Sequence, residues 1–161
     1  MINITLPDGS VKQFEKNSTA MDVAKNISEG LARNVLSAQF NGSTIETKTP
    51  LTEDGKLTLF TWNDAEGKKA FWHSSAHMLA QAILFFYPNA KLTIGPAIDN
   101  GFYYDVDFEG EAMTEADFKK IEDKMLEFAR NKFEFEMRSV SKADALRYYK
   151  NNNNVFKVEL I

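Results

Sequence analysis

Residues 35–46, Val-Leu-Ser-Ala-Gln-Phe-Asn-Gly-Ser-Thr-Ile-Glu, decide the fold of the first part of the chain. The stretch is centred on Asn41-Gly42, which is the strongest short signal in the sequence for a two-residue hairpin turn. It therefore predicts two antiparallel strands, Val35 to Phe40 and Ser43 to Glu46.

The N-terminal residues predict a second hairpin. Ile2, Ile4 and Leu6 alternate with polar residues, which is the period of a half-buried strand. A turn follows at Pro7-Asp8-Gly9-Ser10, because proline fixes φ and glycine permits positive φ. Val11 to Phe14 then returns as the second strand.

A helix and one more strand complete this part of the chain. Thr19-Ala20-Met21-Asp22 has the pattern of a capping box and predicts a helix from Ala20 to about Ile27, ending near Gly30. Beyond the central hairpin, the Asp54-Gly55 turn precedes a strand from Leu57 to Thr61. Strand, strand, helix and strands in this order predict a small sheet wrapped over one helix, a β-grasp fold, over residues 1–62.

Residues 63–68 are polar and contain a glycine, so they predict a linker to a second part, 69–161. The apolar spacing there indicates mixed helices and strands, and the fold class of the chain is therefore α+β. The predicted elements are a helix from Lys68 to Tyr87, a strand at Phe102–Phe108, helices capped at Thr114 and Ser141, and strands at Phe133–Met137 and Val155–Ile161.

Composition excludes several classes of protein. The 161 residues include no Cys, which rules out a disulfide framework, a thiolate zinc cluster and a cysteine nucleophile. The net charge of −4 gives no sign of nucleic-acid binding by bulk charge. No apolar run approaches about 18 residues, so we expect no membrane contact and a cytoplasmic location.

Three groups of residues are candidates for chemistry. His73 and His77, the only histidines, lie four apart on a predicted helix and share one face. Such a pair can bind a metal or place an acid–base group beside an orienting partner, but it also occurs as two partly exposed side chains. Lys157 lies within a predicted strand, where it either attracts a phosphate or oxyanion or is simply solvated.

The third group is the run from Ile94 to Asp105. Gly95 and Pro96 fix a tight approach of the backbone, and an aromatic strand follows them. One interpretation is a pocket wall from which the Tyr104 hydroxyl reaches a ligand, and the other is a hairpin whose aromatic residues form core.

These motifs together resemble the N-terminal region of bacterial threonyl-tRNA synthetases. Residues 1–62, with Ile4-Thr5-Leu6-Pro7-Asp8-Gly9-Ser10 and Ala20-Met21-Asp22-Val23-Ala24, are similar to the TGS domain of that family, a β-grasp module. Residues 69–161 are similar to the first part of its editing domain.

The second similarity is carried by two motifs. His73-Ser74-Ser75-Ala76-His77 matches the family's HxxxH, and the run from Ile94 to Asp105 matches its most specific stretch. The resemblance implies attachment of threonine to tRNA-Thr with ATP, and hydrolysis of tRNA-Thr mischarged with serine. Serine lacks one methyl group, a difference worth only about 1–3 kcal/mol in a single binding step.

The resemblance also implies roles for the candidate residues. Tyr104, Gly95 and Pro96 would bind the serine or threonine moiety at the acceptor end of the tRNA. His73 would polarise or protonate the ribose hydroxyl, while His77 and Lys157 would position water or stabilise the oxyanion.

One departure from the family limits these expectations. Its editing domain continues beyond Ile161 and supplies a Cys and further His, whereas this chain has no Cys. ATP, magnesium, a zinc ion and the homodimer contacts would likewise belong to parts beyond Ile161. We therefore expect the chain to be a fragment that binds no metal and, alone, neither aminoacylates nor edits.

Two alternatives come from other classes of protein. The first is a stand-alone RNA-binding or regulatory module, because TGS domains occur outside synthetases. The second is an editing hydrolase that acts in trans. The run from Ile94 to Asp105 argues against the first, and the missing Cys–His segment argues against the second.

Overall fold

The computed structural model of the protein describes residues 1–133, 135 and 138–161. They form two compact units, Met1–Trp72 and His73–Ile161. In this part of the chain no helix is both long and apolar enough to cross a membrane.

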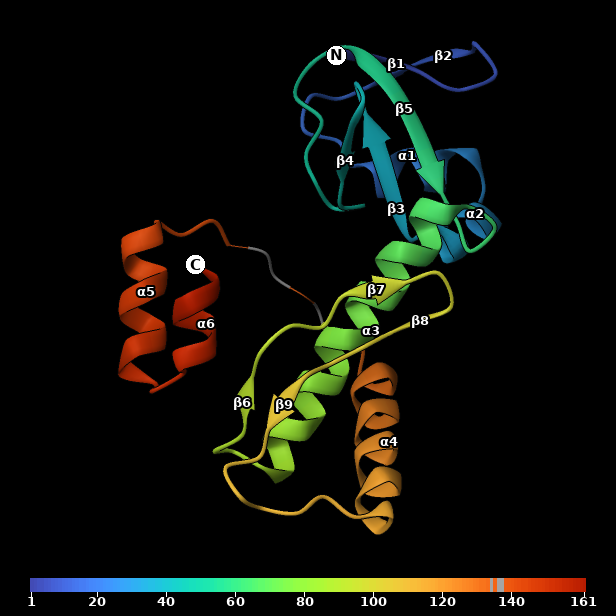
Figure 1. Ribbon diagram of the computed structural model, residues 1–161. Helices are drawn as coiled ribbons and strands as arrows, with labels where there is room; N and C mark the ends of the chain where they lie inside the picture. Colours follow the sequence, from blue (N-terminus) through green and yellow to red (C-terminus); the bar gives the residue numbers. More distant parts are fainter. Residues whose placement is uncertain (134, 136–137) are drawn as a thin grey trace. The chain divides into compact units, whose positions relative to one another are not determined.

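The first unit contains a five-stranded mixed sheet in the order β2-β1-β5-β3-β4 (Figure 1). The outer strands pair antiparallel, while β1 and β5 run parallel at its centre. This arrangement confirms the β-grasp prediction. The strands are β1 (Ile2–Thr5), β2 (Val11–Phe14), β3 (Ser37–Phe40), β4 (Ser43–Ile45) and β5 (Gly55–Phe60).

The hairpin of β3 and β4 turns where the sequence predicts it. Asn41 has φ 48° and Gly42 has φ 85°, so both central residues adopt the positive φ that a type I′ turn requires. The twist of this turn matches that of the strands on either side, which fixes the pairing of Phe40 with Ser43.

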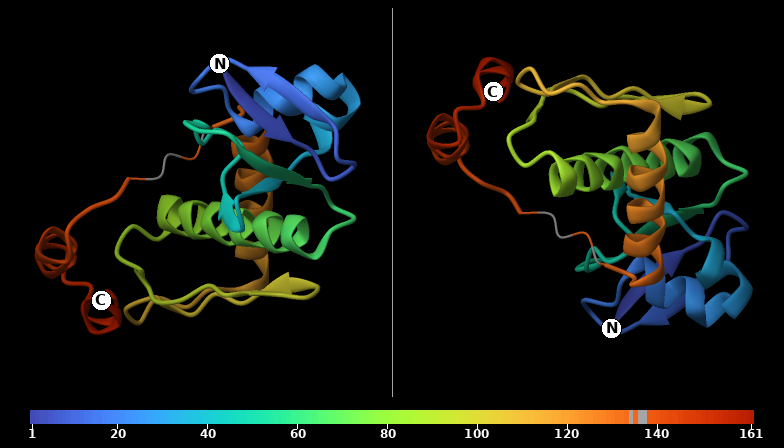
Figure 2. Two further views of the ribbon diagram at one scale, coloured as in Figure 1. Left: turned by 90° about the horizontal axis from the view of Figure 1, so that it is seen from above. Right: turned by 90° about the horizontal axis from the view of Figure 1, so that it is seen from below.

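Helix α1 (Ala20–Ile27) lies against one face of the sheet (Figures 1 and 2). Its capping box forms as predicted, because the Thr19 N–H donates to the Asp22 carboxylate at 2.9 Å and the Asp22 N–H donates to Thr19 Oγ1 at 3.2 Å. The core beneath it is apolar throughout and consists of Ile2, Ile4, Ala20, Val23, Ala38, Leu51 and Leu57.

A second helix, α2 (Glu29–Asn34), follows α1 and was not predicted. Ser28 ends the first helix and caps the second, since its Oγ accepts from the Leu31 N–H at 3.0 Å. Gly30, which the sequence suggested as a stop, lies inside α2.

Helix α3 (Ala65–Phe86) begins three residues before the predicted start at Lys68, so most of the segment expected to be a linker is helical. In the second unit, α3 packs against helix α4 (Glu115–Arg130), which crosses it (Figure 2). The buried residues of this core are Ala82, Ile83, Ala90 and Ile121.

The segment from Lys91 to Asp107 forms a long, irregular hairpin rather than one continuous strand at Phe102–Phe108. It contains two short antiparallel pairs, in which β6 pairs with β9 and β7 with β8. Their bounds are β6 (Lys91–Leu92), β7 (Ala97–Ile98), β8 (Gly101–Phe102) and β9 (Val106–Asp107).

The C-terminal segment differs most from the prediction. Helix α5 (Lys142–Asn151) starts after its Ser141 cap as expected, but Val155–Leu160 forms a helix, α6, and not a strand. A strand needs a partner edge for its backbone groups, whereas a helix bonds internally, and Asn154 caps it through the Lys157 N–H at 3.0 Å. The strand predicted at Phe133–Met137 falls partly on 134, 136 and 137, outside the described residues.

Candidate functional site

The two histidines form a close pair on α3. His73 Nε2 and His77 Nε2 lie 3.1 Å apart, and the rings meet nearly at right angles with centroids 4.5 Å apart. At this distance one nitrogen carries the proton and the other accepts it. The predicted i, i+4 arrangement thus places the two imidazoles in direct contact.

The surroundings of the pair disfavour protonation of His77. Burial of the ring lowers the pKa of His77 below its ordinary value of 6.5, and the charges of His73 and Lys157 lower it further. The lowered pKa favours the neutral form of this imidazole. Phe135 packs against the same ring, with centroids 6.3 Å apart.

Lys157 reaches this neighbourhood from α6. Asn154 holds the start of that helix, because its Oδ1 accepts from the Lys157 N–H at 3.0 Å while its Nδ2 donates to the Leu92 carbonyl of β6 at 3.3 Å. Burial lowers the pKa of the Lys157 ammonium. Asn154 is thus a positioning residue that sequence reasoning missed, although the four-asparagine tract that contains it was visible.

A backbone irregularity positions Tyr104. Two residues of the outgoing arm, Thr93 and Ile94, stand opposite the single Asp105, since the Thr93 N–H donates to the Asp105 carbonyl and the Asp105 N–H donates to the Ile94 carbonyl, both at 3.0 Å. This is the pattern of a β-bulge, which re-aims the side chains next to it.

Gly95 lies directly against the Tyr104 ring. A Cβ at Gly95 would stand 2.4 Å from Tyr104 Cδ2 and 2.5 Å from Cε2, so any side chain larger than that of glycine would overlap the ring. Pro96 continues the contact between the two arms, because its carbonyl accepts from the Tyr103 N–H at 3.1 Å. The predicted close backbone approach is therefore present.

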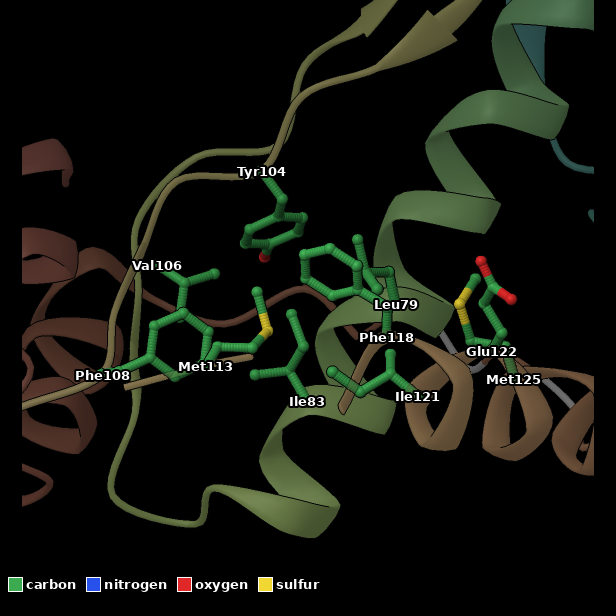
Figure 3. A pocket seen from close by; sticks show the side chains of 10 residues that line it. All are labelled: Leu79, Ile83, Tyr104, Val106, Phe108, Met113, Phe118, Ile121, Glu122 and Met125. Atoms are coloured by element: carbon green, nitrogen blue, oxygen red, sulfur yellow. The ribbon is translucent and has the colours of Figure 1, made fainter. Parts of the chain in front are cut away.

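Tyr104 also lines a cavity of about 320 Å³ between α3, the hairpin and α4 (Figure 3). Burial raises the pKa of its hydroxyl, which stays protonated and points into the cavity. The other lining residues are mostly apolar and comprise Leu79, Ile83, Val106, Phe108, Met113, Phe118, Ile121, Glu122 and Met125.

The structure thus groups the predicted residues into two sets. One contains His73, His77 and Lys157, which interact electrostatically. The other contains Gly95, Pro96 and Tyr104 on the hairpin, and of these the cavity includes Tyr104, while neither histidine is among its lining residues. Glu122, whose carboxylate is the charged group of the lining, was not predicted from the sequence.

Metal coordination receives no support from the described residues. Among them, no group of three or more His, Asp or Glu side chains lies close enough together to hold an ion.

Comparison with known proteins gives a domain and a set of relatives. The TGS domain matches residues 2–61. The chain is 68% identical over all its 161 residues to a threonine–tRNA ligase of Flavobacterium johnsoniae, 63% to one of Flavobacterium psychrophilum and 50% to one of Cytophaga hutchinsonii.

The chain spans about a quarter of the length of these relatives, 24% of the first two and 25% of the third. The match itself covers the whole chain, including both sets of candidate residues. Residues 2–61 are therefore a TGS domain, and the chain as a whole is similar to a segment of threonine–tRNA ligases.

Proposed function

We propose that this chain is part of a threonine–tRNA ligase, and that residues 73–161 contribute to a hydrolytic site that removes serine from mischarged tRNA-Thr. The imidazole pair of His73 and His77, with Nε2 atoms 3.1 Å apart, is the observation that carries the hydrolytic part. The names of the relatives support the identity of the ligase and of its tRNA partner.

Hydrolysis of an aminoacyl ester includes three events that the protein must assist. A water must lose a proton as it attacks the carbonyl carbon, the oxyanion that forms must be stabilised, and the leaving ribose oxygen must gain a proton. Neutral His77 is suited to orient or deprotonate water, since its pKa is lowered. The Lys157 ammonium is suited to stabilise the oxyanion.

His73 is assigned to the leaving side of the reaction. It is hydrogen-bonded to His77, so a proton that one ring accepts can be matched by a proton that the other donates. In this assignment His73 polarises or protonates the ribose hydroxyl. Tyr104, fixed against Gly95, shapes the amino-acid side of the site.

Selection against threonine then follows from size. A hydrolytic site that admits serine can exclude threonine sterically, because threonine carries one additional methyl group. This second selection multiplies the modest discrimination between the two amino acids that the first binding step achieves. The acceptor end of tRNA-Thr would carry the amino acid into this site. ATP, magnesium, zinc and the dimer contacts are assigned to the remaining three quarters of the ligase, as in the expectation from sequence.

The test is deacylation of seryl-tRNA-Thr by the intact ligase that contains this segment. We expect His73→Ala to slow release of serine by 100-fold or more, in line with the usual contribution of about 10²–10⁴ from a general acid or base. Aminoacylation with threonine should be unchanged, and this serves as the internal control. An unchanged deacylation rate in His73→Ala would refute the assignment.

The same assay on the 161-residue chain separates the alternatives. Selective release of serine by this chain alone would favour the trans-acting hydrolase. Binding of tRNA without hydrolysis is the result expected of a segment of the ligase, and is shared with an RNA-binding module. Loss of deacylation in the His73→Ala ligase distinguishes these two.

A further inference from the structure

An exposed group of aromatic side chains lies where β5 leads into α3. Trp62 is 45% exposed and Phe71 is 41% exposed, although aromatic rings of this size usually lie in a core or an interface. We name the group formed by Trp62, Phe71 and Trp72 the aromatic knuckle. It belongs entirely to the first unit.

The three rings hold one another in edge-to-face contact. The Trp62 centroid lies 5.0 Å from that of Phe71 and 5.6 Å from that of Trp72, with planes inclined by 86° and 69°. Phe71 and Trp72 are themselves 5.2 Å apart. These distances are within the favourable range for aromatic pairs, so the exposed rings are fixed in position.

The backbone beneath the knuckle is fixed as well. The Asp64 carboxylate accepts from the Thr61 N–H at 2.7 Å and from Thr61 Oγ1 at 3.0 Å. Gly67 packs so tightly that a Cβ there would stand 1.9 Å from the Thr61 carbonyl oxygen. Trp62 therefore extends from a rigid turn, and little conformational freedom is lost when something binds to it.

A cation accompanies the exposed rings. Lys68 Nζ lies 5.9 Å from the Trp62 ring centroid, near the outer limit of a cation–π contact. Residues 68, 71 and 72 share one face of α3 because they are three and four positions apart. The neighbouring Lys69 is exposed and adds a second ammonium, beside the partly exposed Lys68.

We propose that the aromatic knuckle is an RNA-binding surface on which an unpaired base stacks, with Lys68 pairing with the adjacent phosphate. Fixed aromatic rings beside lysines are the combination with which proteins bind single-stranded nucleic acid. The residues next to the rings in the sequence are polar, namely Asn63, Asp64, Glu66 and Lys69, which suits a single base better than a broad apolar protein surface. The inference rests on the proposed function for its partner, tRNA.

The two tryptophans of the chain allow a direct test. In the Trp72→Phe variant Trp62 is the only tryptophan, and a stacked base quenches its fluorescence. We expect quenching by a 12-nucleotide single-stranded RNA and little by a blunt-ended RNA duplex of the same length. Trp62→Ala should weaken binding of the single strand by roughly 5- to 150-fold, the equivalent of about 1–3 kcal/mol per stacked base.

Matched variants control the experiment. Tyr148→Ala removes another exposed aromatic ring, in α5, and should leave RNA affinity unchanged. Trp62→Phe keeps a stacking surface and should retain most of the affinity, even where Trp62→Ala perturbs folding. Lys68→Ala should reduce the dependence of binding on salt.

Three results would overturn the proposal. The first is equal quenching by the single strand and the duplex, and the second is a Trp62→Ala affinity within twofold of the parent. The third is loss of self-association in Trp62→Ala, which would assign the knuckle to a protein contact. If the Trp62→Ala variant binds tRNA-Thr with the affinity of the parent chain, the stacking surface is refuted and the tRNA partner is retained. If no RNA binds, the stacking surface is refuted and the His73 assay still decides the hydrolytic proposal.

Discussion

Gly95 and Tyr104 depend on each other at the scale of single residues. The bulge at Thr93 and Ile94 brings the two arms of the hairpin close, and the Tyr104 ring occupies the space where a side chain at position 95 would begin. The direction of the Tyr104 hydroxyl therefore depends partly on the absence of a Cβ atom at Gly95.

We expect Gly95→Ala to destabilise the second unit by about 1–3 kcal/mol, because the new methyl group overlaps the Tyr104 ring. Denaturant unfolding measures this loss. Gly30→Ala is the matched control, since a Cβ there meets only Ser28 Oγ at 3.9 Å, and it should be neutral or slightly stabilising. An equal penalty for Gly95→Ala in a Tyr104→Ala background would show that the ring is not the cause.

At the scale of elements, local signals were predictable and the choice between helix and strand was not. The bounds of α1 follow from Thr19 and Asp22, because a capping box acts within one turn. The alternation of Val155 to Ile161 indicated a strand, yet a strand depends on a partner that no local pattern specifies. The double role of Ser28, which ends α1 and starts α2, was missed for the opposite reason, since Gly30 appeared to be a stop.

Helix α4 gives a prediction on capping and pH. The Thr114 N–H and Oγ1 both donate to the Asp117 carboxylate, at 2.9 and 2.7 Å, and Lys120 Nζ donates to its other oxygen at 2.9 Å. These bonds hold the pKa of Asp117 far below its ordinary value of 3.8. The folded state thus binds this proton less readily than the unfolded state, and the resulting stabilisation is present above pH 3.8.

Asp117→Ala should therefore lower the melting temperature at pH 7, and the difference from the parent should shrink as the pH falls below 3.8. Thermal unfolding followed by circular dichroism at several pH values measures both effects. Asp123→Ala removes an exposed carboxylate of the same helix, paired with Lys119 at 3.3 Å, and should change little. A deficit for Asp117→Ala that is constant with pH would contradict the linkage.

At the scale of the whole chain, the fold of the first unit was easier to predict from the sequence than the arrangement of the candidate site. The β-grasp order of strands follows from short hairpins and one amphipathic helix, which are local features. The site instead depends on the long-range placement of Lys157 near His77, which α6 and Asn154 determine together. The helical spacing of His73 and His77 predicted that their side chains share one face. No local pattern in the sequence predicted the cavity that Tyr104 lines.

We expect residues 1–72 to fold without the rest of the chain. The buried core of this unit is drawn only from residues between Ile2 and Leu57, and its aromatic knuckle ends at Trp72. The amide chemical shifts of the 1–72 fragment should superpose on those of the same residues in the full chain, apart from positions next to the cut. Collapsed or broadened signals would show that the core needs residues beyond Trp72.

The side-chain amide of Asn154 has one consequence for the ageing of the protein. Its oxygen caps α6 and its nitrogen reaches the Leu92 carbonyl of β6. Deamidation would convert it to aspartate, which retains the accepting oxygen and loses the donating nitrogen. Chemical damage at this single position would leave α6 capped while removing the side-chain hydrogen bond that links it to β6.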